Sequence, residues 1–158
     1  RHGTCCVLLA VEPLSGWRMR RVYRRRTKRE YALFMRELSE HYPKARCIRL
    51  VQDNLNTHSP ASFYERFDPV QARLLTKRFD MHYTPKHASW LNMAEIELSV
   101  LARQCLHRRL ATQKQLTREV RAVERERNHR RATIQWRFTT SKARCTLARH
   151  YDNVHHSS

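Results

Sequence analysis

Apolar runs of strand length mark the first third of the chain. Residues 4–11 (TCCVLLAV) are continuously apolar, and Pro13 and Gly16 after them predict a turn. Residues 17–23 then predict the returning strand of a hairpin. Residues 46–52 predict another strand, which delivers Asp53 to its C-terminal end. A carboxylate in that position is poorly solvated, so it needs a cation, a metal ion or a hydrogen-bond donor as its partner.

Two capping boxes indicate where long helices begin. Thr27 with Glu30 precedes an amphipathic pattern that ends at Pro43. Thr112 with Gln115 precedes a basic helix whose apolar positions face inward, namely Leu116, Val120 and Val123.

Shorter elements fill the middle of the chain. Ser59-Pro60 and Asp68-Pro69 each resemble an N-cap followed by proline, which predicts two short helices within residues 60–79. Residues 81–84 predict a short strand, and residues 92–106 are apolar on two sides, which predicts a helix deep in the domain. This order of elements predicts an α/β protein with a mixed sheet and flanking helices.

The charge of the chain points to its partner. Its 158 residues include 32 Lys and Arg against 14 Asp and Glu, a net charge of +18 with a pI near 10.8. This balance indicates contact with phosphate groups, although proteins associated with ribosomes share it and it does not separate DNA from RNA. Two glycines are too few for a Gly-rich phosphate loop. Five cysteines without CxxC spacing indicate reduced core residues, so we expect a cytoplasmic protein. No apolar run reaches the roughly 18 to 20 residues of a membrane span, so we expect no membrane contact.

Arginines are concentrated in two segments. Such a run can be a solvated strand edge that blocks pairing, and its density here also fits an edge that faces phosphates. We predict contacts with nucleic-acid phosphates from both segments, which would be DNA contacts under the resemblance described below, through Arg18, Arg20, Arg21, Arg24, Arg25 and Arg26 near the second strand and Arg118, Arg121 and Arg125 on the basic helix.

Asp53 and Glu95 are the acids that could share a metal ion. Carboxylates that converge from a strand end and a helix can hold divalent cations, which stabilise the attacking and leaving oxygens of a phosphodiester. Glu97 points the opposite way from Glu95, because two residues turn a helix by about 200°. Asn92 with Glu95 is itself a capping box, so the spacing alone leaves Glu95 either a ligand or a cap.

Two long motifs resemble the catalytic core of bacterial insertion-sequence transposases of the mariner superfamily. They are residues 51–58 (VQDNLNTH) and residues 82–97 (HYTPKHASWLNMAEIE). The similarity extends from residues 10–17 (AVEPLSGW) through residues 136–140 (WRFTT). Members of that family are DDE enzymes with a ribonuclease-H-like fold.

The resemblance implies roles for individual residues. Asp53 corresponds to the second catalytic acid and Glu95 to the third, with Glu97 as the rival for that position. Both acids would bind Mg²⁺ or Mn²⁺, and the partner would be DNA, cleaved at insertion-sequence ends and joined to a target. Asn54, Asn56 and His58 would support the ligands, and Lys86, His87 and Trp90 would contact DNA, although His58 and His87 could equally be polar surface residues.

The same resemblance implies that one acid is missing. In the family the first catalytic Asp lies on a strand before the segment that matches residues 4–11, and this sequence starts after it. We therefore expect an N-terminally truncated copy whose sheet lacks its first strand and folds poorly alone. The expected parts are a partial DDE catalytic core (residues 1–111), a basic helical extension of the same domain (112–151) and a polar tail (152–158). We expect a complete protein to act as a homodimer. The alternative functions are a non-catalytic nucleic-acid-binding remnant and a cellular nuclease of the same fold.

Overall fold

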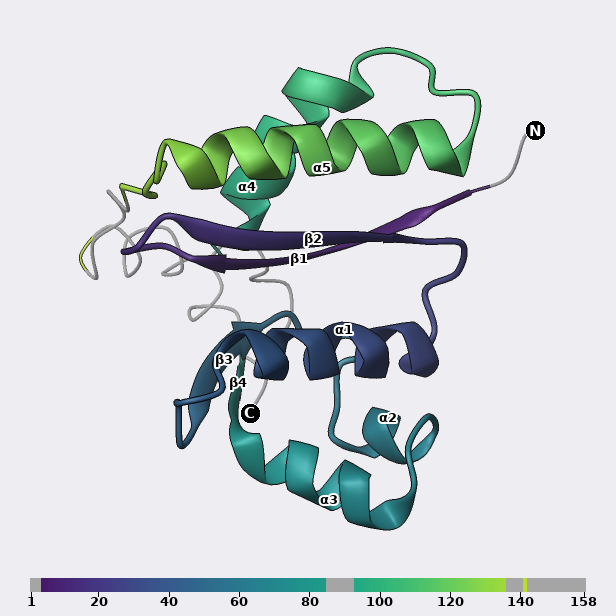
Figure 1. Ribbon diagram of the computed structural model, residues 1–158, viewed down its shortest axis with the longest axis vertical. Coiled ribbons are helices and arrows are strands. Elements are labelled where there is room, and N and C mark those ends of the chain that lie inside the picture. The colour runs from purple at the N-terminus through teal and green to yellow at the C-terminus, as the bar shows by residue number, and fades with distance from the viewer. Residues whose placement is uncertain (1–3, 85–92, 136–140, 142–158) are drawn as a thin grey trace, which may run out of the picture.

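The computed structural model describes residues 4–84, 93–135 and 141 of the chain. Figure 1 shows a two-stranded hairpin between two helical layers, with a second pair of strands beside it. The elements in chain order are β1 (Cys6–Glu12), β2 (Trp17–Tyr23), α1 (Lys28–His41), β3 (Ile48–Gln52), α2 (Ala61–Tyr64), α3 (Pro69–Arg78), β4 (Phe79–Tyr83), α4 (Ala94–Leu101), the π-helical turn η2 (Ala102–Leu106) and α5 (Gln113–His129).

The β1–β2 hairpin has the predicted antiparallel pairing. Cys6 lies opposite Tyr23 and Glu12 lies opposite Trp17. Gly16 closes the turn in the left-handed region, with a φ of 73°, and its N–H donates to the Glu12 carbonyl at 3.0 Å. A Cβ at this position would lie 2.5 Å from the backbone of Arg131, so glycine is required for two reasons.

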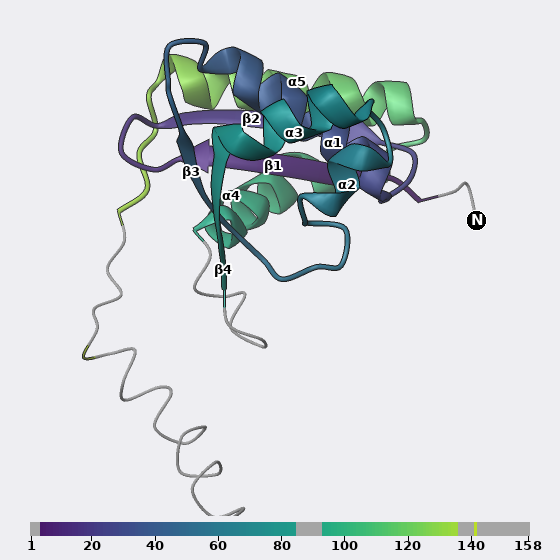
Figure 2. The same ribbon diagram turned by 90° about the horizontal axis from the view of Figure 1, so that it is seen from below.

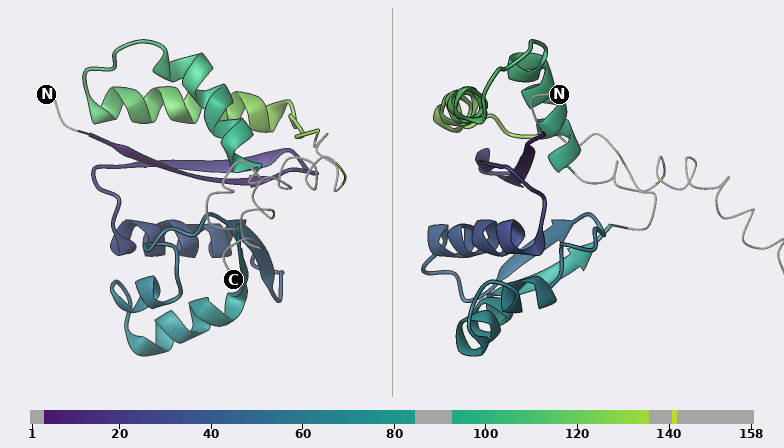
Figure 3. Two further views of the ribbon diagram at one scale, coloured as in Figure 1. Left: turned by 180° about the vertical axis from the view of Figure 1, so that it is seen from behind. Right: turned by 90° about the vertical axis from the view of Figure 1, so that its right-hand side faces the viewer.

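β3 and β4 form a separate parallel pair. Their register runs from Ile48 opposite Phe79 to Gln52 opposite Tyr83. In the described residues the four strands form two sheets of two strands each, where the sequence predicted a mixed sheet without its first strand. Both strands of the second pair end on the side of the molecule where α4 begins (Figure 3).

Helix α1 packs against residues of both sheets. Its capping box is confirmed: the Thr27 side chain accepts from the helix backbone, while Glu30 accepts from the Thr27 N–H. Its apolar face is buried in one core with residues of both sheets. Helices α2 and α3 pack against α1, below it in Figure 1 and in front of it in Figure 2, which is seen from below. The core residues are Met19, Tyr31, Ala32, Phe34, Met35, Leu38, Phe63, Ala72, Leu75 and Phe79.

A second, smaller core lies on the opposite face of the hairpin. Leu101 and Cys105 pack there against Val120 and Val123 of α5, and Leu116 adds to them, so the predicted inward face of α5 is confirmed. The Thr112 side chain accepts from the Gln115 N–H at 3.1 Å, as a cap should. Among the described helices, none is long and apolar enough to cross a membrane.

Three helix predictions need correction. Pro60 rather than Ser59 occupies the N-cap of α2, and it has no side-chain capping bond, whereas Asp68 caps α3 as predicted. The helix predicted over residues 92–106 is described from residue 93 onward; it is a regular α-helix over α4 and continues as η2. It is also shallower than expected, because Ile96 remains 40% exposed.

The outer edge of β2 is covered by side chains of α5. Asn128 accepts from the Arg18 N–H at 2.9 Å and donates to the Arg18 carbonyl at 2.8 Å. Glu124 accepts from the Arg20 N–H. These bonds replace the ones that a further strand would make, so they block this edge against strand pairing.

Candidate functional site

Asp53 follows directly after β3, and its carboxylate has the partner that its position requires. Its Oδ1 lies 2.6 Å from Nδ1 of His58, and the side chain is 34% exposed. The hydrogen bond from His58 lowers the pKa of Asp53, and partial burial opposes that effect. Because an ionised carboxylate only accepts, Nδ1 of His58 carries the proton.

The His58 side chain is itself fixed by the end of β3 and by α1. Its ring stacks on Tyr31 with centroids 4.7 Å apart, and Tyr31 donates its hydroxyl hydrogen to Gln52 at 2.8 Å. Gln52 in turn donates to the His58 carbonyl at 3.2 Å. Within the described residues, Nε2 of His58 is buried without a hydrogen-bond partner. This arrangement positions the ring against Asp53, and it leaves Asn54 and Asn56 exposed beside it.

Glu95 and Glu97 have opposite environments on α4. Glu95, in the first turn, is exposed. Glu97 is fully buried and binds Arg18 (Nε–Oε2 3.0 Å), Arg20 (Nη2–Oε2 2.7 Å) and Arg127 (Nη2–Oε1 2.6 Å). Three guanidinium groups therefore occupy the Glu97 carboxylate, which leaves Glu95 as the acid of this helix that a ligand from solvent can reach.

The prediction that Arg18 and Arg20 contact DNA is corrected by this cluster. Both side chains are 0% exposed and point from β2 toward α4 and α5, where they bind Glu97. Burial lowers the pKa of each guanidinium, and Glu97 opposes that effect. Arg21 lies on the other face of β2, where its Nε donates to both oxygens of Glu37 at 2.9 and 2.8 Å.

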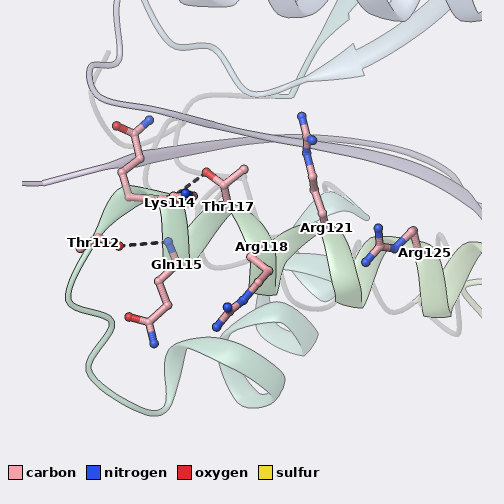
Figure 4. A pocket seen from close by; sticks show the side chains of 8 residues that line it. Thr112, Lys114, Gln115, Thr117, Arg118, Arg121 and Arg125 are labelled. Carbon is pink, nitrogen blue, oxygen red and sulfur yellow. Dashed lines mark hydrogen bonds between the residues drawn. The ribbon is translucent and has the colours of Figure 1, made fainter.

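The remaining predicted DNA-contacting residues divide into exposed and undescribed ones. Arg24, Arg25 and Arg26 are exposed in the segment before α1. Lys86, His87 and Trp90 lie outside the described residues. Figure 4 shows Arg118, Arg121 and Arg125 following one another along α5, where they line an open groove with Thr112, Gln113, Lys114, Gln115 and Thr117.

Asp53 and Glu95 each carry donors that suit a hard divalent cation, but the described residues do not form a metal site around them. Asp53 and Glu95 offer carboxylate oxygens, which Mg²⁺ and Mn²⁺ prefer. Over residues 4–84, 93–135 and 141, however, no group of three or more His, Cys, Asp or Glu side chains could hold a metal ion.

Two features of this region were not predicted from the sequence. The contact of Gln52 with Tyr31 and with the His58 carbonyl depends on residues that are not neighbours in the chain. The burial of Arg18 and Arg20 had a signal, because residues two apart on a strand share a face and Glu97 interrupts an apolar helix pattern.

Comparison with known proteins adds one match. The model of a protein family described as DDE superfamily endonuclease matches residues 1–117. No curated protein and no solved structure matches the chain. The matched region contains Asp53 with His58, the α4 acids and the start of α5. Because this match covers well over half of the 158 residues, the chain belongs to the DDE superfamily of endonucleases.

Proposed function

We propose that this chain supplies the catalytic core of a transposase that cleaves DNA strands at the ends of an insertion sequence and joins the freed 3′ end to target DNA. Membership of the superfamily indicates a transposase-type nuclease function with DNA as its substrate. The observation that carries the proposal is the pairing of Asp53 with His58 at the end of β3, within motifs that resemble transposases of the mariner superfamily.

In this proposal Asp53 and Glu95 hold the metal, with further oxygen ligands from outside the described residues. Endonucleases of this superfamily generally use divalent metal ions. A Mg²⁺ or Mn²⁺ ion bound there would stabilise the charge that develops on the phosphodiester oxygens during strand cleavage. His58 keeps Asp53 ionised and oriented, and Tyr31 with Gln52 keeps the His58 ring in place.

The exposed arginines supply the path for the DNA backbone. Arg118, Arg121 and Arg125 recur along one helix face, and Arg24, Arg25 and Arg26 add charge near the hairpin. Contacts of this kind position a duplex without reading its sequence. Each neutralised phosphate makes the slope of log K against log salt concentration more negative by about 0.9.

The strand arrangement supports a ribonuclease-H-like fold with one strand missing. β1 of the hairpin and β3 of the parallel pair are both packed against the core of α1, yet they belong to separate sheets. A strand between β1 and β3, from another segment or another chain, would join the two sheets into the mixed sheet of that fold.

A metal-dependent cleavage assay on the protein from its natural reading frame tests this function. We expect strand cleavage of DNA carrying the insertion-sequence end with Mg²⁺ or Mn²⁺, and its loss in Asp53→Asn and Glu95→Gln while DNA affinity is nearly unchanged. Glu65→Gln, an exposed acid at the end of α2, is the matched control and should cleave normally. Cleavage retained in Asp53→Asn would overturn the proposal.

The DNA path has its own test. Replacing Arg118, Arg121 and Arg125 by Gln should weaken DNA binding and reduce the salt slope by up to about 3. The control replaces two exposed cations of α3, Arg73 and Lys77, on the far side of the molecule. An unchanged salt slope in the α5 variant would show that these α5 arginines do not contact the DNA backbone.

A second candidate is a DNA-binding remnant without chemistry. It is favoured by the finding that the described residues bring together no group of three metal-binding side chains. Salt-sensitive DNA binding without cleavage in either metal, by the protein from its natural reading frame, would select this alternative.

A further inference from the structure

We propose that Glu97 is a positioning residue, whose carboxylate, bound by Arg18, Arg20 and Arg127, fixes the rotation of α4 and thereby the direction of Glu95. The inference rests on the proposed role of Glu95 as a metal-binding carboxylate. It assigns to the rival acid of the same helix a task that requires no contact with metal or DNA.

The contacts to Glu97 come from two different elements. Arg18 and Arg20 reach it from β2, with Arg20 Nη2 at 2.7 Å from Oε2 and Arg18 Nε at 3.0 Å from the same oxygen. Arg127 reaches it from α5 through two parallel bonds, Nη2–Oε1 at 2.6 Å and Nε–Oε2 at 3.1 Å. Both oxygens are held, and a two-pronged arginine bond fixes the plane of the carboxylate as well as its place.

These contacts act on the first turn of α4, whereas the residues of this segment that belong to the apolar core lie toward its other end. The N-cap position, Met93, has no side-chain capping bond, and Ile96 is 40% exposed. The apolar anchors, Leu101 and Cys105, lie at the far end of α4 and in the following turn. Glu97 is thus the buried residue of the first turn, which also carries Glu95.

Rotation is the property that this anchor determines. Two residues of a helix are separated by about 200°, so a Glu97 that points into the cluster directs Glu95 to the opposite side of α4. The exposures agree, since Glu97 is 0% exposed and Glu95 is exposed. An apolar side chain could fill the same space, but it would accept no directed bonds and would leave the helix freer to rotate.

The cost of the cluster supports a role beyond stability. Arg18 and Arg20 are fully buried, and three cations face one carboxylate, with Nη1 of both Arg18 and Arg20 buried without a partner among the described residues. A buried charge cluster with unpaired donors is a poor way to gain stability, because desolvation offsets the Coulomb attraction. Its directed bonds fit a positioning function better.

Binding of Mn²⁺ alone, measured without DNA by the loss of the free-ion EPR signal, tests the inference. The deciding variant is Arg127→Lys, which keeps the charge at a side chain 18% exposed but loses the two-pronged bond. We expect its Mn²⁺ dissociation constant to rise at least about 10-fold, with an unchanged circular dichroism spectrum. Glu97→Gln should show a larger rise. The matched control is Arg130→Lys, an exposed arginine paired with Glu126, and it should bind Mn²⁺ normally.

Glu95→Gln separates failure of the inference from failure of the proposed function. If Glu95→Gln leaves Mn²⁺ binding unchanged, Glu95 is not a ligand and the proposed function fails together with this inference. If Glu95→Gln weakens binding but Arg127→Lys binds as the parent does, the proposed function stands and the positioning role of Glu97 is overturned.

Discussion

The side-chain amide of Asn128 takes the place of a neighbouring strand at the outer edge of β2, and its removal should measurably destabilise the protein. Asn128 makes two bonds to one residue, accepting from the Arg18 N–H at 2.9 Å and donating to the Arg18 carbonyl at 2.8 Å. Both bonds are partly buried. Asn128→Ala leaves the N–H and the carbonyl of Arg18 without their partner. The rest of α5 still covers this edge of β2, which limits replacement by water.

The magnitude follows from these two bonds. A net hydrogen bond contributes about 1 kcal/mol, and leaving a buried partner unpaired costs about 1–3 kcal/mol. Because both groups are only partly buried, we expect Asn128→Ala to lower the free energy of unfolding by about 2–3 kcal/mol. Asn128→Asp keeps the acceptor but places a carboxylate oxygen against the Arg18 carbonyl, so its loss should be no smaller, about 2–3 kcal/mol.

Urea unfolding of the parent and the two variants checks this, with the midpoint expected to fall at an unchanged m-value. His129→Ala, the exposed neighbour on the same helix, is the control and should unfold like the parent. A loss below about 0.5 kcal/mol for Asn128→Ala would refute the reasoning, because changes of that size are typical of ordinary surface positions.

Three further predictions address the core, a cap and the site. Phe63→Ala should lower the free energy of unfolding in urea by about 3–5 kcal/mol, because the ring is 0% exposed and lies between those of Tyr31 and Phe79. A decrease below about 1 kcal/mol would contradict this. Asp68→Ala should lower the free energy of unfolding by about 1 kcal/mol, and Asp68→Asn by much less, because the side chain accepts from two N–H groups at 3.0 Å. Equal decreases in both variants would argue against a capping role. His58→Ala should raise the pKa of Asp53, measured by NMR of its carboxyl carbon against pH. The pKa of Asp53 is lower in the folded protein than in the unfolded chain. The stability gained from its bond to His58 is therefore present above the unfolded pKa and lost as the pH falls through the folded pKa. An unshifted Asp53 pKa in His58→Ala would exclude His58 as the cause.

Features that depend on near neighbours in the chain could be predicted from the sequence. The capping box of Thr27 and Glu30, the cap at Asp68 and the inward face of α5 each involve residues within one or two helical turns. The β2 strand was predicted with its observed bounds, since a Gly-closed turn and a returning apolar pattern are also local. The separation of the strands into two sheets depends on long-range pairing, which periodicity does not report.

The site was predictable to a smaller extent, for a related reason. The alternation of β2 identifies its two faces, but it does not say which face other elements cover. Arginines on one face of a strand indicate a solvent-exposed face unless a buried acid is known to pair with them. Here that acid, Glu97, lies 77 residues from Arg20 in the chain. His58, five residues after Asp53, was expected to support that acid, and the structure places the two in contact at 2.6 Å.

Because α1 packs against both sheets, a mutation in its buried face can affect residues on both sides of it. Asp53 belongs to the side of α1 that carries the parallel pair, whereas α4, with Glu95, packs on the hairpin side and contacts β1. The distance between the two proposed ligands therefore depends on the packing of α1 against both sides, through residues such as Met35, which is 1% exposed. Conservative core changes in α1 that leave the protein folded should therefore change the distance between Asp53 and Glu95.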